Sequence, residues 1–253
     1  MKVPAGYERL LLGHAVAVAR ADFAISIRRS LVGADGARNT LLEYAARQPG
    51  ARVLQGRGTA YAVSLPQSTS RVVVRHNRHG GLFGGITGDR FLAPTRAPYE
   101  LDVALALAKH GVPTPDVVAF VLYPPGGLLQ RSDVATREIT GGRDLADIVT
   151  RDGGPERAAA FAATAALIAA MARSGARHAD LNAKNVLVTY ETAYVLDLDR
   201  VTLGVSPGDA LEANLARLGR SLRKWRDRFG AHISERDIAE LESNARHATE
   251  ASE

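Results

Sequence analysis

Hydrophobic positions in the first half of the chain follow the spacing of β-strands. Short runs that are apolar or alternate with polar residues occur at residues 51–54, 59–65, 71–76, 117–123 and 132–140. Glycines and a serine-rich turn separate several of these runs, as expected between strands. The pattern therefore predicts a β-rich first half.

One helix is expected within this strand-rich half, after Thr95. Thr95 can cap its N-terminus, and Leu101, Leu105 and Ala108 recur on one face. The segment Gly111-Val-Pro-Thr-Pro115 ends it, because glycine allows a left-handed cap and the prolines cannot continue a helix.

After Gly141-Gly142 the hydrophobic positions take the period of helices. Helices are predicted at residues 145–149 and 155–173, and two short strands at 186–189 and 193–198. The remainder is helical, with an apolar stripe at 3.6-residue spacing. The stripe comprises Leu211, Leu215, Leu218, Leu222, Trp225 and Phe229.

This order predicts an α+β fold with a β-rich N-lobe, residues 1–141, and an α-helical C-lobe, residues 142–253. The 253 residues are 46% hydrophobic and 23% charged, which suits a chain that buries a core. Alanine-rich residues 158–172, between two arginines, are typical of a closely packed central helix and fall short of the ~20 residues of a membrane span. The N-terminus does not resemble a signal peptide.

The amino-acid composition excludes only a few classes of binding partner and of site. Lysine and arginine exceed aspartate and glutamate by 32 − 27 = 5, which favours an anionic partner. Aromatic residues make up 6% of the chain and few lie near the basic runs, so a nucleic-acid partner is not expected. The chain has no cysteine, which excludes disulfides and thiolate sites and fits a reducing compartment.

The strongest chemical signal is a pattern of carboxylates and an amide in the second half. In His178-Ala-Asp-Leu-Asn-Ala-Lys-Asn185, Asp180 stands five residues before Asn185, and Asp197 follows twelve residues later at the end of an apolar strand. Phosphoryl transfer needs a carboxylate to accept the hydroxyl proton, and oxygen ligands to hold Mg²⁺. Each residue alone is also typical of a turn or cap.

Together these residues resemble the catalytic and metal-binding loops of the protein-kinase-like superfamily. Three features differ from protein kinases: alanine follows His178, no Ala-Pro-Glu segment follows, and Asp199 replaces the glycine of Asp-Phe-Gly. A regulated platform for protein substrates is therefore not expected.

The first half supplies candidate nucleotide-binding residues. Gly56 and Gly58 lie between two predicted strands, where a glycine-rich loop could cover phosphates, although Tyr61 stands where a third glycine would be and an ordinary hairpin turn fits equally. Arg75 lies where protein kinases have their phosphate-pairing lysine, and Glu100 could orient it. A solvated strand end and a favourable first-turn acid are the alternatives for these two residues.

Segments throughout residues 50–225 resemble the 3-deoxy-D-manno-octulosonic acid (Kdo) kinases of the lipopolysaccharide core kinase group. They include Gly56-Arg-Gly-Thr59, Val74-Arg-His-Asn-Arg-His-Gly-Gly-Leu82, Gly88-Asp-Arg-Phe91, Thr136-Arg-Glu138, His178-Ala-Asp-Leu-Asn182 and Asn214-Leu-Ala-Arg-Leu218.

The resemblance implies ATP-dependent transfer of phosphate to a Kdo hydroxyl, expected to be the 4-hydroxyl, of a lipid A precursor. It implies Asp180 as general base, Asn185 and Asp197 as Mg²⁺ ligands, and Arg75 as a phosphate clamp supported by Glu100. Asp199 could add a metal or supporting role, or pair with Arg200.

The implied acceptor is an anionic glycolipid at the cytoplasmic face of a Gram-negative inner membrane, so a cytoplasmic, peripheral protein is expected. Arg217, Arg220, Lys224 and Arg228 share one helix face that could lie on an acidic bilayer, and a solvated basic face is the alternative.

Three histidines lie close to these candidate residues. His178 is expected to pack and form hydrogen bonds rather than act as a base. His76 and His79, beside a glycine-rich segment read as a flexible loop, are expected to be polar loop residues rather than metal ligands.

Two alternatives stay open. One is another kinase of the same fold, acting on heptose or on small molecules such as aminoglycosides, because substrate identity lies in the pocket and loops. The other is a non-catalytic kinase-like module that binds nucleotide or lipid, which the departures at Tyr61, Arg75 and Asp199 would permit.

Overall fold

The structure is a computed structural model that describes residues 2–33, 36, 38–55, 58–76, 91–92, 96–123, 129–151 and 153–251. By its internal contacts the chain divides into two units: unit 1 is Met1–Leu101 with Asp116–Glu138, and unit 2 is Asp102–Pro115 with Ile139–Glu253. The predicted lobes, residues 1–141 and 142–253, stay a prediction. Among the described residues, no helix is both long and apolar enough to cross a bilayer.

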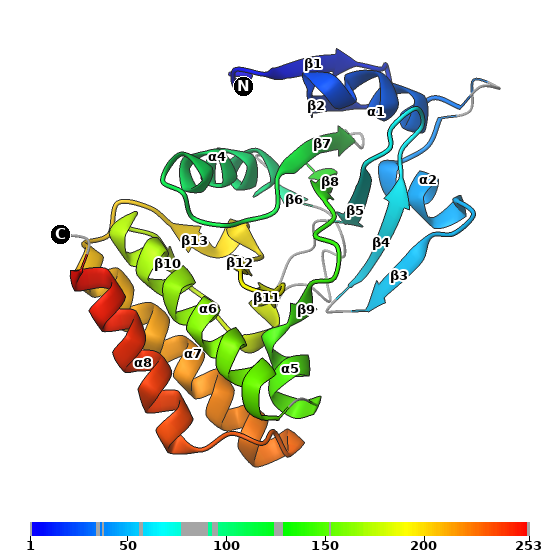
Figure 1. The fold of residues 1–253 in the computed structure, drawn as a ribbon. Coiled ribbons are helices and arrows are strands. Elements are labelled where there is room, and N and C mark those ends of the chain that lie inside the picture. The colour runs from blue at the N-terminus through cyan, green and yellow to red at the C-terminus, as the bar shows by residue number, and fades with distance from the viewer. Residues whose placement is uncertain are drawn as a thin grey trace. The chain divides into compact units, whose positions relative to one another are not determined.

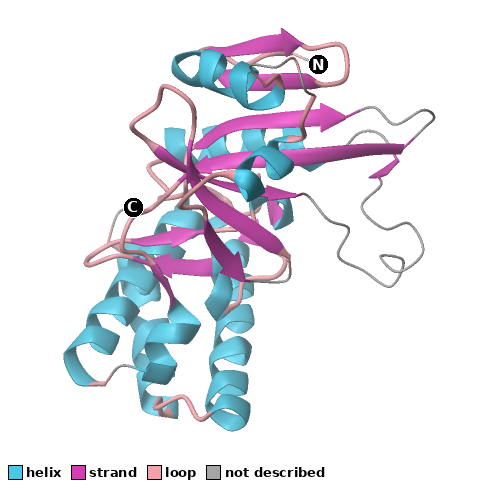
Figure 2. Ribbon diagram, turned by 90° about the vertical axis from the view of Figure 1, so that its right-hand side faces the viewer, coloured by secondary structure: helices cyan, strands magenta, loops and turns pink. Residues whose placement is uncertain are grey.

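Unit 1 is built on an antiparallel sheet (Figures 1 and 2). Its strands are β1 (Tyr7–Leu11), β2 (Val16–Arg20), β3 (Arg52–Gln55), β4 (Thr59–Ser64), β5 (Arg71–His76), β6 (Phe91–Leu92), β7 (Val117–Tyr123) and β8 (Leu129–Arg137). The order is β1-β2-β7-β8-β5-β4-β3, and β6 also pairs with β8. Strands β5 and β7 have the predicted bounds, and β3, β4 and β8 overlap the other predicted runs.

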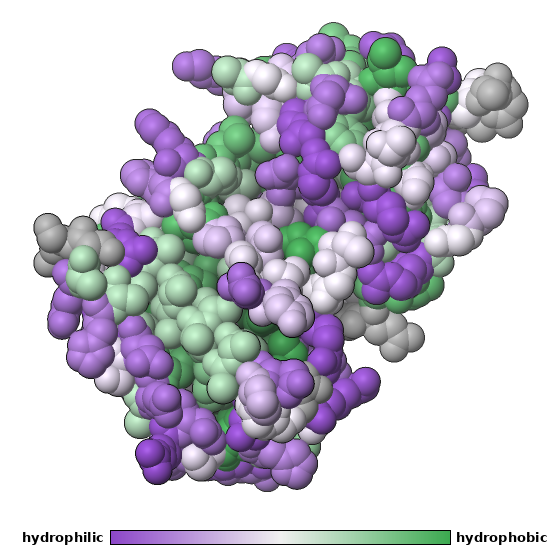
Figure 3. Space-filling view, viewed as in Figure 1, coloured by the Kyte–Doolittle hydropathy of each residue, from purple (hydrophilic) through white to green (hydrophobic). Residues whose placement is uncertain are grey.

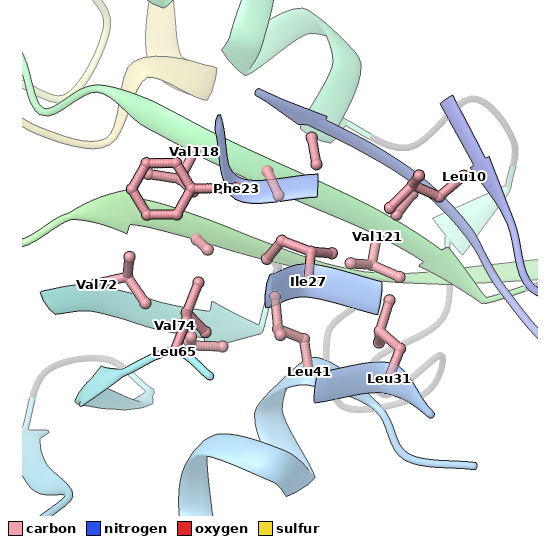
Figure 4. Packing of buried hydrophobic residues seen from close by; sticks show 14 of the residues in the cluster. Leu10, Phe23, Ile27, Leu31, Leu41, Leu65, Val72, Val74, Val118 and Val121 are labelled. Atoms are coloured by element: carbon pink, nitrogen blue, oxygen red, sulfur yellow. The ribbon is translucent and has the colours of Figure 1, made fainter. Parts of the chain in front are cut away.

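The core of unit 1 lies between this sheet and three short N-terminal helices, η1 (Ala21–Phe23), α1 (Ala24–Leu31) and α2 (Leu41–Arg47). Phe23, Ile27 and Leu41 from the helices pack against Val74 of β5 and Val121 of β7 (Figure 4). Burying each such side chain contributes about 1.5–3 kcal/mol to folding. The sequence pattern had assigned no elements to this N-terminal segment.

A buried polar network joins α2 to strands β5, β7 and β8. Asp133, fully buried, accepts hydrogen bonds from the Leu42 backbone N–H (2.9 Å) and the Tyr123 hydroxyl (2.9 Å), and lies 2.6 Å from His76 Nδ1. The Leu41 N–H donates to the Tyr123 oxygen (2.7 Å), and burial raises the pKa of Tyr123. His76 is thus a strand residue paired with a carboxylate, so its prediction as a loop residue is wrong.

Unit 2 is mainly helical. Its helices are α5 (Leu145–Arg151), α6 (Gly154–Arg173), η2 (Ala183–Asn185), η3 (Leu198–Arg200), α7 (Pro207–Phe229) and α8 (Glu235–Glu250). Its short strands β9 (Arg143–Asp144), β11 (Val186–Val188) and β12 (Ala193–Val195) form one sheet, and β10 (Arg177–His178) pairs with β13 (Val201–Thr202). Helix α4 (Arg96–Lys109) spans the boundary between the two units. The predicted α+β fold class is confirmed.

Helix α6 is the central helix of unit 2, and α7 and α8 pack beside it (Figure 1). Ten of its residues are buried and five of these are alanines, whose small side chains allow close helix packing. Its exposed positions include Ala158, Ala159, Ala162 and Ala166, and the surface over α6 is pale green in Figure 3. The predicted close-packing role of this segment is confirmed.

Helix α7 begins at a Ser206 cap, whose side chain accepts from the Asp209 N–H, and ends at Gly230 in the left-handed conformation (φ 67°). Its leucines Leu211, Leu215, Leu218 and Leu222 are buried as predicted. The last two members of the predicted stripe are not: Trp225 is half-buried and Phe229 is 52% exposed. The apolar stripe therefore extends beyond the core that it was expected to fill.

Candidate active site

Asp180 lies in the turn between β10 and η2, and backbone hydrogen bonds hold this turn on both sides. Before it, the Ala179 N–H donates to the Arg200 carbonyl (2.8 Å). After it, the Ala183 N–H donates to the Ser221 hydroxyl on α7 (3.0 Å). The loop that presents Asp180 is thus fixed to both η3 and α7.

His178 connects Asp180 to the segment that carries Asp197. Its Nδ1 accepts from the Asp180 N–H (3.1 Å), and its Nε2 faces the Leu196 carbonyl (3.0 Å). These partners require a neutral ring protonated on Nε2. Burial lowers the pKa of His178, which favours the same neutral form. The structure confirms His178 as a buried hydrogen-bonding residue.

Asn185 is hydrogen-bonded to Asp180 and to Leu196, the residue before Asp197. Its Nδ2 donates to the Asp180 carbonyl (2.9 Å), and its own carbonyl accepts from the Leu196 N–H (2.9 Å). Asn182 Nδ2 donates to the same Asp180 carbonyl (3.0 Å). Because the amide nitrogen of Asn185 makes this bond, its side-chain oxygen is the end that can act as a ligand.

Asp197 has a left-handed backbone, with φ 61° and ψ 51°. Among the described residues only Gln67 shares a positive φ without being glycine. This conformation costs roughly 1–3 kcal/mol and is often retained where it aims a functional side chain. It is held by the Arg200 N–H, which donates to the Asp197 carbonyl (3.1 Å).

The donors near this loop suit a hard cation. Asn185 and Asp197 offer an amide oxygen and a carboxylate, which are ligand types that Mg²⁺ prefers. Asp199 is almost buried, with Arg200 Nε 3.9 Å from its Oδ1. Within the described ranges no group of three or more His, Asp or Glu side chains gathers. A Mg²⁺ ion here would therefore complete its shell with water and phosphate oxygens, as it commonly does.

Asn214 of α7 is a supporting residue to which the sequence analysis assigned no role. It is fully buried; its Oδ1 accepts from the His178 N–H (2.9 Å), and its Nδ2 donates to the Ala176 carbonyl (2.9 Å). Its signals in the sequence were its place at the start of the family-like segment Asn214-Leu-Ala-Arg-Leu218 and its position as a polar residue beside the apolar stripe.

Arg75 and Glu100 form an ion pair within unit 1. Arg75 is in β5, where its backbone pairs with Ala60 and Val134 on either side. Glu100 is 2% exposed, so the guanidinium compensates a buried carboxylate. The pairing that the sequence left open is present.

The remaining predicted positions are less informative. Gly58 directly precedes β4. Gly56, the Thr95 cap and His79 with its neighbouring glycine-rich segment lie outside the described residues. The structure thus brings Asp180, Asn185 and Asp197 into one hydrogen-bonded region of unit 2, and joins Arg75 to Glu100 in unit 1.

Comparison with known proteins identifies the family. The model described as "Lipopolysaccharide kinase (Kdo/WaaP) family" matches residues 46–244. The chain belongs to this family. It is therefore a phosphotransferase by membership, and the resemblance drawn from its motifs is confirmed.

Two relatives of the Kdo/WaaP family carry the name 3-deoxy-D-manno-octulosonic acid kinase. The protein from Vibrio parahaemolyticus is 33% identical over 191 residues, which covers 74% of this chain and 78% of that protein. The protein from Stenotrophomonas maltophilia (strain K279a) is 35% identical over 191 residues and covers 74% of each.

Two solved structures share the fold. WaaP in complex with acyl carrier protein matches with a TM-score of 0.52 and 18% identity, covering 87% of this chain and 86% of that one. The amicoumacin kinase hAmiN in complex with AMP-PNP, Ca²⁺ and Ami matches with a TM-score of 0.56 and 11% identity, covering 81% and 73%. The kinase-like fold predicted from the motifs is thus confirmed.

Proposed function

We propose that the protein is a Kdo kinase that transfers the γ-phosphate of ATP to a Kdo hydroxyl, the 4-hydroxyl, of a lipid A precursor. The observation that carries this proposal is the 33–35% identity to Kdo kinases over 191 residues, together with the family match over residues 46–244, which contains the catalytic loop. The hydrogen-bonded arrangement of Asp180, Asn185 and Asp197 supports it, because phosphoryl transfer depends mainly on positioning and electrostatics.

In this reaction Asp180 is the general base. Its carboxylate accepts the proton of the acceptor hydroxyl, whose oxygen forms a bond to the γ-phosphorus while the bond to ADP breaks. The backbone of Asp180 is fixed by His178 on the N–H side and by Asn182 and Asn185 on the carbonyl side. A base held in this way loses little entropy when the acceptor binds.

Asn185 and Asp197 are proposed as the Mg²⁺ ligands. When bound, Mg²⁺ would offset the negative charge of the ATP phosphates. The left-handed backbone of Asp197 sets the direction of its carboxylate, and the bond from the Leu196 N–H to the Asn185 carbonyl keeps the two segments together.

In unit 1, Arg75 is proposed to contact the phosphates of ATP, with Glu100 holding its guanidinium. Arginine can contact two phosphate oxygens at once. Because Glu100 is buried, the pair is screened little by salt and fixes the arginine more firmly than a surface pair would. Gly56 and Gly58 are proposed to lie near the same phosphates.

A peripheral contact with the cytoplasmic face of the inner membrane is also proposed. Arg217, Arg220, Lys224 and Arg228 are exposed, and none of them forms an ion pair with a described residue. On a different face of α7, Arg223 and Arg226 are neutralised by Glu235. A row of unneutralised cations suits anionic lipid headgroups, which attract each basic residue with about 1 kcal/mol.

Flotation with vesicles tests this contact. The variant Arg220→Glu/Lys224→Glu should lose binding to phosphatidylserine vesicles by more than about tenfold, and 0.5 M salt should weaken the wild type similarly. Equal flotation of variant and wild type would exclude this face as the membrane contact.

The activity itself is tested with Mg-ATP and a Kdo-bearing lipid A precursor, followed by mass spectrometry of the lipid. One added phosphate, placed on the Kdo 4-hydroxyl by fragmentation, is expected. The isosteric variant Asp180→Asn should add none. Transfer to a heptose acceptor instead of Kdo would assign the protein another sugar, and nucleotide binding without any transfer would indicate a non-catalytic module.

A further inference from the structure

The surface immediately after Asp180 combines a lysine with two aromatic rings. Lys184 Nζ lies 5.6 Å from the ring centroid of Trp225, and the Trp225 and Phe229 ring centroids are 4.4 Å apart. The bond from the Ala183 N–H to Ser221 holds this end of the catalytic loop on α7. Lys184 follows the proposed base by four residues and is thus part of the same loop.

These side chains are accessible and are not needed by the core. The Lys184 side chain is 56% exposed, Phe229 is 52% exposed and Trp225 is half-buried. The leucines before them on α7 fill the core, whereas the two aromatic rings continue the stripe onto the surface. Neighbouring aromatic rings that reach the surface beside a catalytic loop are typical of a binding surface.

The charge of this surface is positive. The carboxylate partner of Lys184 is Asp144, at the outer limit of an ion pair with 4.0 Å between Nζ and Oδ2. Lys224 precedes Trp225 directly, and Arg228 precedes Phe229; neither pairs with an acid among the described residues. Lys184 thus places a cation beside the Trp225 ring, and the exposed Lys224 and Arg228 add positive charge on an adjacent face of α7.

We propose that Lys184 and Trp225 form the acceptor subsite, in which Trp225 contacts the C–H face of a sugar ring and Lys184 binds the carboxylate of that ring. A sugar acid carries both groups, whereas a neutral sugar offers the lysine no carboxylate. This inference rests on the proposed function and identifies residues that select an acidic acceptor. Trp225 also keeps the ammonium group near the loop through a cation–π contact.

The chain has a single tryptophan, so Trp225 itself reports on binding. Titration with the Kdo-bearing acceptor should change the tryptophan emission, and Mg-ATP alone should not. If the tryptophan emission stays constant at acceptor concentrations where calorimetry shows binding, the placement of Trp225 in the subsite is overturned.

Steady-state kinetics test Lys184. Lys184→Ala should raise KM for the acceptor about tenfold or more, because a hydrogen bond to a charged group is lost, while KM for ATP is unchanged. Lys184→Arg should recover part of the affinity, since it restores the charge. Trp225→Leu should raise the same KM, and Lys109→Ala, an exposed lysine of α4, should change neither constant. An unchanged acceptor KM in Lys184→Ala overturns the proposal.

A double-mutant cycle tests the contact between Lys184 and the carboxylate directly. It combines Lys184→Ala with an acceptor whose Kdo carboxylate is converted to the amide. The wild type should lose affinity for the amide by about the factor that Lys184→Ala loses for the acid, and Lys184→Ala should lose little further. Equal losses from amidation in both proteins would mean that another group binds the carboxylate.

The test also separates failure of the subsite from failure of the function. If the wild type binds the acceptor but transfers no phosphate, the Kdo kinase assignment fails. The subsite is then judged by calorimetry with the wild type and Lys184→Ala. Weaker acceptor binding by Lys184→Ala supports the subsite, and equal acceptor binding by both proteins overturns it.

Discussion

Replacing Asn214 by leucine should destabilise unit 2 and displace the catalytic loop. Asn214 is fully buried, and its amide makes two hydrogen bonds of 2.9 Å, with the His178 N–H and the Ala176 carbonyl. Leucine would leave both backbone groups buried and unpaired, at about 1–3 kcal/mol each. The apolar side chain recovers part of this loss, so the expected decrease in the free energy of unfolding is about 3 kcal/mol.

Urea denaturation followed by circular dichroism measures this decrease. With a slope of about 2 kcal/mol per molar urea, the midpoint of the unit 2 transition should fall by roughly 1.5 M. Arg217→Ala, an exposed position on the same helix, should leave the midpoint within about 0.3 M of the wild type. A shift as small as the control's for Asn214→Leu would show that the two bonds do not anchor the loop. In the fraction of the Asn214→Leu variant that remains folded, kcat should fall about a hundredfold, because the loop carrying the proposed base loses its fixed position.

Two further predictions concern the nucleotide clamp and the buried histidine. Glu100→Gln removes the charge that orients Arg75 but keeps its shape, so KM for ATP should rise about tenfold while acceptor KM is unchanged; an unchanged KM for ATP would separate this pair from nucleotide binding. Burial lowers the pKa of His178 from its ordinary value of 6.5, so the unfolded chain binds the proton more tightly. Its stabilising contribution is therefore complete above pH 6.5 and is lost as pH falls through the lower pKa of the folded state. Urea midpoints at pH 7.5 and 5.5 should differ less in His178→Gln than in the wild type, and an equal difference would contradict this assignment.

Local pattern predicts the strands and helices that bury one regular face. Strands β5 and β7 were predicted with their observed bounds, because uninterrupted apolar runs between turn residues have few other conformations. The N-terminal strand β1 was missed, since only Leu10 of its five residues is buried and the run shows no alternation. Helices η1 and α1 were missed because they are short and depend on the sheet for their stability.

The catalytic loop was predictable because its chemistry lies within a short stretch of sequence. Asp180, Asn185 and Asp197 are spaced as in other kinase-like proteins. The residue types and the spacing between them therefore indicated the catalytic loop without a structure. Roles for these residues stay proposals, since spacing shows neither substrate nor metal.

Interactions between distant segments could not be predicted in this way. Asn214 contacts a residue 36 positions earlier, and His76 pairs with Asp133 across 57 positions. Both depend on which helix or strand packs beside the other, and local periodicity carries no such information. The exposure of Phe229 is similar: helical spacing placed it on the apolar face, but not beyond the end of the core.

The most direct test of the proposed function is phosphate transfer to the lipid. The purified protein is incubated with Mg-ATP and a Kdo-bearing lipid A precursor beside Asp180→Asn, and the lipid is weighed by mass spectrometry. A gain of one phosphate on Kdo with the wild type, and no gain with a folded Asp180→Asn, is the predicted result. An unchanged lipid with the wild type, or equal transfer by both proteins, would contradict the assignment of the acceptor or of the base, respectively.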